Sequence, residues 1–111
     1  MLPKKFRLPA KDFKRQYQRG KKIRGRYGMF VVSDNDVGNP RFGFVVSKKV
    51  GNAVERNRVT RVLRAIVMDV INEKNMSNIG KDFQYIAFKA CEKTSVLRKE
   101  VFFQMQEVLN D

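Results

Sequence analysis

The feature that most constrains the fold is an apolar stripe in the middle of the chain. Over residues 53–74, an advance of 100° per residue places five apolar side chains within an arc of roughly 100°. They are Val59, Val62, Leu63, Ile66 and Val70. The stripe predicts a long helix with one face on a core. Its opposite side carries Asn57, Arg61 and Arg64 within an arc of about 60°.

Shorter patterns on both sides of this helix predict a mixed architecture. We expect helices over residues 10–19 and 94–109 and strands over residues 23–32, 41–47 and 83–88. The order of elements predicts a two-layer α/β sandwich, in which a small mixed sheet packs with about three helices as one domain over residues 1–111.

Two details of this architecture depend on loops. The turn-forming run at residues 33–40 favours a hairpin between the first two strands, although other pairings stay open. The pattern also has room for a further short strand beside that pair. Residues 1–9 contain Pro3 and Pro9 and predict an extended basic arm.

The basic charge of the chain is concentrated in one part of the sequence. Residues 1–64 contain 18 Lys or Arg and 4 Asp or Glu, a net charge of +14, whereas residues 65–111 carry a net charge of −1. This imbalance indicates a polyanion as partner, either nucleic acid or an anionic membrane. No apolar run approaches the ~20 residues that span a bilayer. Residues 1–7 lack the apolar core of a signal peptide, so we expect a cytoplasmic protein without a membrane partner.

The residue types argue against a self-contained enzyme. The chain has no His and a single Cys, Cys91, which we expect to be buried or half-buried. The carboxylate pairs at 34 and 36 and at 69 and 73 have no flanking residues that support a site, so solvated charge is the favoured interpretation. We therefore predict no catalytic residue and no metal ligand in this chain.

The run from Ser47 to Arg64 is the strongest candidate binding segment. It holds six basic residues and one acid, and its helix uses Arg almost without acidic partners one turn away. Arg presents forked donors that suit phosphate oxygens, and Gly51-Asn52 before the helix can aim backbone N–H groups at a phosphate. A solvated charged helix face is the alternative.

Phe13 and Tyr17, with Lys14 between them, form a second candidate. Rings four residues apart on a helix can stack unpaired bases while neighbouring cations hold the backbone. The same spacing is more often found in a core, and the pattern alone favours that interpretation.

The sequence resembles a known family. The stretch from Arg41 to Val54, with Ser47-Lys48-Lys49 and Gly51-Asn52-Ala53, followed by Arg56-Asn57-Arg58, is similar to the diagnostic motif of the protein subunit of bacterial ribonuclease P. Weaker agreement covers most of the chain, including residues 7–20 and residues 82–90.

The resemblance implies a fold and an activity. The fold would be ribonuclease P protein-like, grouped with ribosomal protein S5 domain 2, and would contain an unusual left-handed βαβ crossover. The activity would be Mg²⁺-dependent removal of the 5′ leader from precursor tRNA. A catalytic RNA would hold the Mg²⁺ and cut, so this chain would be part of an enzyme without supplying the chemistry.

The resemblance also implies two RNA-binding surfaces. Residues expected to contact the catalytic RNA are Lys48, Lys49, Asn52, Arg56, Asn57, Arg58, Arg61 and Arg64. Residues expected to contact the single-stranded leader are Phe13, Tyr17, Lys14 and Lys89. The sequence departs from the family at Thr60, where Lys is common, and at Val31, where an aromatic residue is common. Tyr27 or Phe30 could take the place of that aromatic residue.

Three other functions are compatible with the charge. A small structural or ribosomal RNA-binding protein would need no cleft for a single strand. A DNA-binding domain would place the 53–74 helix in a major groove, but a loop and a strand precede this helix instead of a second helix. A nuclease acting alone would cut RNA without another component. We therefore expect no DNA partner.

Overall fold

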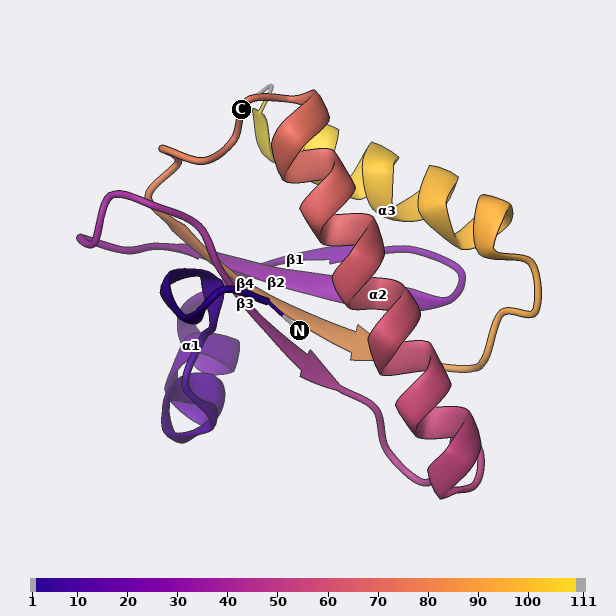
Figure 1. Cartoon of the computed structure of the whole chain (residues 1–111). Helices are drawn as coiled ribbons and strands as arrows, with labels where there is room; N and C mark the ends of the chain where they lie inside the picture. Colours follow the sequence, from indigo (N-terminus) through magenta and orange to yellow (C-terminus); the bar gives the residue numbers. More distant parts are fainter. Residues whose placement is uncertain (1, 110–111) are drawn as a thin grey trace.

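The computed structural model describes residues 2–109, so the two ends of the expected 1–111 domain lie outside the described residues. Two short 3₁₀ helices, η1 (Lys4–Phe6) and η2 (Ala10–Asp12), precede the helix α1 (Phe13–Arg19). The remaining elements are β1 (Lys21–Arg24), β2 (Gly28–Asp34), β3 (Arg41–Val45), α2 (Ala53–Glu73), β4 (Lys81–Ala87) and α3 (Thr94–Leu109) (Figure 1). The predicted mixed architecture with three α-helices is confirmed.

The four strands form one mixed sheet in the order β1-β2-β4-β3. β2 pairs antiparallel with β1 and β4, whereas β3 pairs parallel with β4. The favoured hairpin between residues 23–32 and 41–47 is therefore wrong, because β4 lies between β2 and β3. Asp82, Phe83, Gln84 and Tyr85 are all buried, so β4 is covered on both faces and occupies the centre.

The predicted strand over residues 23–32 is divided by a turn, which yields the further short strand β1. The carboxylate of Glu100 on α3 accepts hydrogen bonds from the backbone N–H groups of Arg26 and Tyr27. Gln104 of α3 donates from Nε2 to the carbonyl oxygens of Ile23 and Gly28, at 3.0 and 3.1 Å. These contacts from α3 hold the turn that the local pattern of residues did not reveal.

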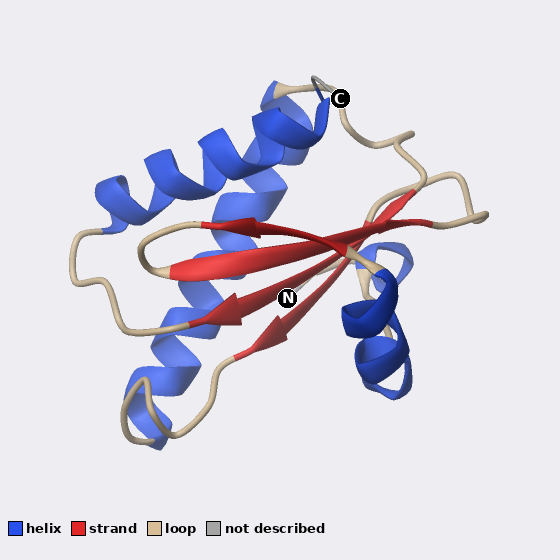
Figure 2. Cartoon of the chain, turned by 180° about the vertical axis from the view of Figure 1, so that it is seen from behind, coloured by secondary structure: helices blue, strands red, loops and turns tan. Residues whose placement is uncertain are grey.

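The helices lie on both faces of the sheet. α2 and α3 cover one face and α1 covers part of the other (Figures 1 and 2). The apolar stripe of α2 meets the sheet as predicted, with Val62 half-buried at its margin. Buried residues of this stripe are Val59, Leu63, Ile66, Val67, Val70 and Ile71. Each fully buried side chain of this size contributes roughly 1.5–3 kcal/mol.

The N-terminal segment is packed against the body of the protein, so the prediction of a simple extended arm is wrong. Leu2, Phe6 and Leu8 are buried, and the Leu8 N–H donates to the carbonyl oxygen of Phe42 at 2.9 Å. Three apolar side chains in the arm make this docking favourable. The segment also covers part of the exposed edge of β3. No helix within residues 2–109 is long and apolar enough to cross a membrane.

Candidate nucleic-acid interface

The basic run begins with a loop that the structure holds in a defined position. Val50 is buried and its N–H donates to the carbonyl oxygen of Ser47 at 3.0 Å. Lys48 and Lys49 lie between these anchors with exposed side chains. Neither lysine has a side-chain hydrogen bond or ion pair within residues 2–109, so both ammonium groups are available to an anion.

Asn52 and Glu55 form a reciprocal cap at the start of α2. The Asn52 Oδ1 accepts from the Glu55 N–H at 2.9 Å, and the Glu55 Oε1 accepts from the Asn52 N–H at 2.9 Å. The carbonyl oxygen of the Asn52 side chain is thereby occupied, and its Nδ2 remains as a donor. This role of Asn52 was missed, although an Asn followed three residues later by Glu is a signal of a capping box.

Both arginines of the Arg-Asn-Arg motif donate hydrogen bonds to neighbouring loops. Arg56 is half-buried and donates from Nη1 to the carbonyl oxygen of Gly51 at 2.9 Å. Arg58 donates from Nη2 to the carbonyl oxygen of Glu92 at 3.4 Å. Both guanidinium groups tie α2 to neighbouring loops and retain other N–H donors.

Asn57, Arg61 and Arg64 form an open row beside this motif. With Val54 and Thr60 they line a hollow of about 390 Å³ on α2, which confirms that they share one side of the helix. None of the three has a side-chain hydrogen bond or ion pair in the described part of the chain. We call these three residues the α2 row. Its cations have no internal carboxylate to neutralise them, which favours binding of phosphates.

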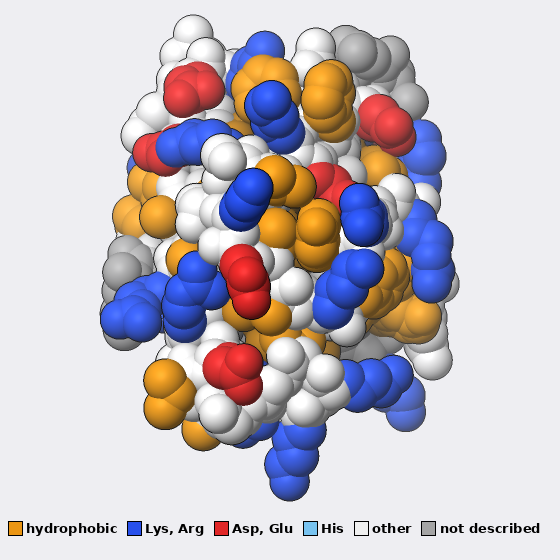
Figure 3. Space-filling model, turned by 90° about the vertical axis from the view of Figure 1, so that its right-hand side faces the viewer, with side chains coloured by type: hydrophobic (Ala, Val, Ile, Leu, Met, Phe, Trp, Pro, Cys, Tyr) orange, Lys and Arg blue, Asp and Glu red, His pale blue; other side chains and the backbone are white. Residues whose placement is uncertain are grey.

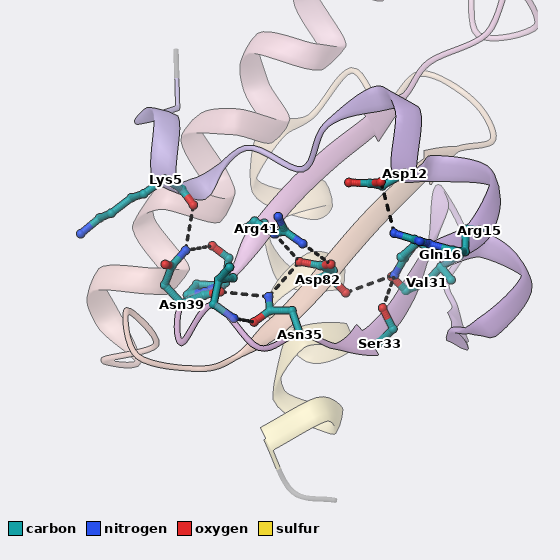
Figure 4. A network of polar contacts seen from close by, with 12 residues as sticks. Lys5, Asp12, Arg15, Gln16, Val31, Ser33, Asn35, Asn39, Arg41 and Asp82 are labelled. Carbon is teal, nitrogen blue, oxygen red and sulfur yellow. Dashed lines mark hydrogen bonds and ion pairs between the residues drawn. The ribbon is translucent and has the colours of Figure 1, made fainter.

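Polar contacts hold α1 against the sheet. The side chain of Gln16 is buried and donates from Nε2 to the carbonyl oxygen of Val31 at 2.7 Å (Figure 4). Gln84 on β4 donates from Nε2 to the Gln16 Oε1 at 2.9 Å and to the carbonyl oxygen of Phe13 at 3.0 Å. These bonds fix the position of Phe13 relative to the sheet.

Phe13 borders the α2 row. Its ring lies against Gly43 of β3, where a side chain would leave no room for it. Phe13 lines a hollow of about 260 Å³, and Thr60 and Arg64 line the same hollow. Arg64 and Thr60 also line the hollow of the α2 row. The structure therefore places Phe13 beside Thr60 and Arg64 of α2.

Tyr17 lies one turn further along α1. Its side chain is 42% exposed, and the Nζ of Lys22 lies 4.5 Å from the centre of its ring. Neither Phe13 nor Tyr17 belongs to the hydrophobic core cluster, although the Phe13 ring is half-buried against Gly43. Lys14 is exposed between them and has no side-chain partner within residues 2–109.

Lys89 lies elsewhere on the sheet. It follows the end of β4, and its Nζ is 5.3 Å from the centre of the Tyr27 ring at the β1–β2 turn. Val31 is buried beneath Gly20, and Phe30 is buried on the opposite face, in the core. Of the two residues proposed to replace the missing aromatic at Val31, Phe30 is therefore excluded as a contact for RNA.

Two further cation–aromatic contacts near the β1–β2 turn were not predicted from the sequence. The guanidinium carbons of Arg24 and Arg26 lie 4.9 Å from the ring centre of Phe88 and 5.6 Å from that of Tyr27, respectively. The strand pattern of residues 21–24 puts Arg24 and Lys22 on one face, but nothing in the sequence shows that Phe88 comes beside them.

Four aspartates lie together around a hollow that borders α1. Asp82 accepts from the Arg41 Nε and Nη2 at 2.8 and 2.9 Å and from the Asn35 Nδ2 at 2.8 Å (Figure 4). The hydrogen bond to Asp82 raises the pKa of Arg41, and that from Lys81 lowers the pKa of Asp34. This hollow of about 460 Å³ is lined by Asp12 and Asp36 and also by Arg15 and Arg19, so its charges are mixed.

The second pair of carboxylates has a structural role. Asp69 and Glu73 on α2 both form ion pairs with Arg98 of α3. Cys91 is buried as expected. Within residues 2–109, no group of three His, Cys, Asp or Glu is arranged to hold a metal ion.

Comparison with known proteins agrees with the motif and the fold. A sequence model of the family described as Ribonuclease P matches residues 2–109. A ribonuclease P protein component from Syntrophomonas wolfei is 41% identical over 70 residues, which cover 62% of this chain and 59% of that protein. The chain thus spans about three fifths of the length of this relative. One from Bacillus cereus strain AH187 is 37% identical over 92 residues, which cover 81% of this chain and 77% of that protein.

A solved structure shares the whole architecture. A Staphylococcus aureus RNase P protein mutant with defective mRNA degradation activity superposes with a TM-score of 0.76 at 25% identity, and the match covers 95% of this chain and 89% of that one. The motif at residues 41–64, the mixed four-stranded sheet and the family match over residues 2–109 lead to one conclusion: the chain belongs to the ribonuclease P protein family.

Proposed function

We propose that this chain is the RNA-binding protein component of a cytoplasmic ribonuclease P that removes the 5′ leader from precursor tRNA. The α2 row would bind the catalytic RNA together with Lys48, Lys49, Asn52, Arg56 and Arg58. Phe13, Lys14 and Tyr17 would bind the single-stranded leader, and Lys89 would contact RNA at the far end of β4.

The observation that carries this proposal is the junction between the α2 row and Phe13. Arg61 and Arg64 are cations without internal partners, and Arg64 shares a hollow with a half-buried ring. Cations beside an accessible ring suit RNA that passes from a structured region into unpaired nucleotides. A protein that binds only folded RNA has no need of the ring.

The residues of this chain do not fit a Mg²⁺ site of their own. Asp34 is paired with Lys81, and Asp69 and Glu73 are paired with Arg98. The described residues offer no cluster of three ligands. We therefore propose that Mg²⁺ is held by the catalytic RNA and its substrate. The cations of this chain would reduce repulsion between the two RNAs and so lower the Mg²⁺ concentration that cleavage requires.

Contacts to the leader would give the complex a preference for substrate over product. Mature tRNA lacks the leader and cannot stack on Phe13 or Tyr17. Stacking of one base contributes about 1–3 kcal/mol, which corresponds to a difference in affinity of about 5- to 150-fold.

The test is to add the purified chain to a bacterial ribonuclease P RNA at low Mg²⁺ and to measure 5′ maturation of precursor tRNA. Binding of precursor and leaderless tRNA to the assembled complex is measured in parallel. We expect stimulation of cleavage and tighter binding of the precursor. Absence of stimulation would reject the proposal, and equal affinity for the two tRNAs would instead favour a structural RNA-binding protein.

Two variants test the two surfaces. Arg61→Ala removes a cation that has no internal partner, and we expect weaker binding of the catalytic RNA with leader preference retained. Phe13→Ala should reduce leader preference and leave binding of the catalytic RNA unchanged. Lys99→Ala, which removes an exposed cation from α3, is the matched control for loss of charge.

A further inference from the structure

Two cation–aromatic pairs lie on the α1 side of the sheet. Lys22 and Arg24 share that face of β1 because Ile23 between them is buried in the core. Lys22 lies over the ring of Tyr17 at 4.5 Å, and Arg24 lies over the ring of Phe88 at 4.9 Å. Two residues along a strand separate the cations by about 7 Å, a distance that neighbouring nucleotides of an extended strand can bridge.

The pair of Arg24 and Phe88 is held in place by the sheet. The Phe88 N–H donates to the carbonyl oxygen of Tyr27 at 2.8 Å, which extends the pairing of β4 with β2 beyond Ala87. The Arg24 Nη1 lies 4.0 Å from the Met29 Sδ on the neighbouring strand. The Arg24 side chain remains exposed and that of Phe88 half-buried, so a flat ligand can reach them.

The surroundings of the pair are cationic. Arg26 and Lys89 both lie over Tyr27 at the adjacent turn. The carboxylate of Glu100 is engaged with the backbone N–H groups of that turn and does not form an ion pair with these cations in the described residues. Figure 3 views the molecule from the end that carries the β1–β2 turn, and shows Lys and Arg side chains, with a smaller number of Asp and Glu, around exposed hydrophobic ones.

We propose that Arg24 and Phe88 form a second stacking site for an unpaired RNA nucleotide. The inference rests on the proposed function, because the occupant is the part of the leader beyond the nucleotides held by Phe13 and Tyr17. Phe13 lies over β3 and Tyr17 contacts Lys22 of β1, so the chain of contacts crosses the sheet towards Arg24. A guanidinium group and a ring both stack on unpaired bases, whereas bases of a duplex are already stacked.

The position of Arg24 and Phe88 favours the leader over the catalytic RNA as the occupant of this site. The α2 row lies on a helix that covers the opposite face of the sheet (Figures 1 and 2). RNA bound to α2 therefore reaches Arg24 only if a single strand crosses the α1 side of the sheet.

The experiment measures the affinity of the assembled complex for precursor tRNAs with a short leader and with a long leader. The variants Arg24→Gln and Phe88→Leu are compared with Lys99→Gln, which also removes an exposed cation, and with Phe103→Leu, which makes the same change of an aromatic ring; both controls lie on α3. We expect each test variant to bind the long-leader substrate about tenfold more weakly and the short-leader substrate as the wild type does. The two control variants should bind both substrates normally.

Phe88→Tyr keeps an aromatic ring and should retain the affinity for the long leader, which separates stacking from any effect of Phe88→Leu on folding. Unchanged long-leader affinity in both test variants, with Phe13→Ala still reducing leader preference, would overturn this inference alone. An equal loss for both leader lengths would place the contact on other RNA and would also overturn it. Failure of the wild-type chain to stimulate the catalytic RNA would instead reject the proposed function.

Discussion

Phe13 of α1 and Arg64 of α2 line the same hollow, although their helices cover opposite faces of the sheet. They meet because β3 is an edge strand and because Gly43 lets the Phe13 ring lie directly on it. An RNA strand bound to the α2 row would therefore have an aromatic ring in the adjoining hollow.

The position of Arg64 predicts a mixed phenotype. We expect Arg64→Ala to weaken binding of the catalytic RNA and also to reduce the preference for precursor over leaderless tRNA. Arg61→Ala should affect only the first property. Each variant should lower the slope of log affinity against log salt for the catalytic RNA by about one unit. A normal leader preference in Arg64→Ala would contradict the shared surface.

Gly43 should be required for the position of Phe13. The added Cβ of Gly43→Ala would meet the Phe13 ring, and we expect a destabilisation of about 1–3 kcal/mol together with a loss of leader preference. Thermal unfolding and tRNA binding provide the measurements. In a Phe13→Ala background the same substitution should cost much less, because the ring is absent. An equal cost in both backgrounds would show that the ring is not the cause.

The sequence predicted elements better than it predicted their neighbours. The apolar stripe located α2 to within a residue because its period of 3.6 extends over many turns. The order of the strands was not predicted, since alternation along a strand reveals its buried face but not the strand beside it. β4 occupies the centre of the sheet, where its residues are buried on both faces, so β2 and β3 each pair with β4 and not with one another.

In the candidate site too, local groupings of residues were predicted but contacts between distant elements were not. Asn57, Arg61 and Arg64 were placed together because one helix carries them. The contacts of Phe13 with Gly43 and of Arg24 with Phe88 join residues far apart in the sequence, and only the sheet brings them together. The cap formed by Asn52 and Glu55 was predictable, because an Asn followed three residues later by Glu is a local signal within one helix.

Asn52 should have two separable functions. Asn52→Ala removes the cap and should destabilise the protein by about 0.5–2 kcal/mol. Asn52→Asp keeps an oxygen that accepts from the Glu55 N–H, so the free energy of unfolding should stay close to that of the wild type. It removes the Nδ2 donor and adds a negative charge, and binding of the catalytic RNA should fall. Chemical denaturation and RNA titration measure the two effects. Unchanged RNA affinity in Asn52→Asp would limit Asn52 to capping.

Tyr85 should make the protein sensitive to alkaline pH. Its ring is buried, and its hydroxyl has no hydrogen-bond partner in the described residues. Burial raises the pKa of Tyr85, and the nearby Glu100 carboxylate acts in the same direction. In the unfolded chain the hydroxyl ionises near its ordinary pKa of about 10. Above that pH the folded state holds a proton that the unfolded state has lost, so the free energy of unfolding falls as pH rises.

Tyr85→Phe removes both the unpartnered hydroxyl and this titration. We expect the variant to be about 1 kcal/mol more stable at neutral pH, because an unsatisfied buried group is no longer desolvated on folding. The difference between variant and wild type should widen above about pH 10. Denaturant unfolding across that range measures it, and the other titrating groups cancel in the comparison. A variant that is less stable than the wild type at neutral pH would show that a buried water molecule satisfies the hydroxyl.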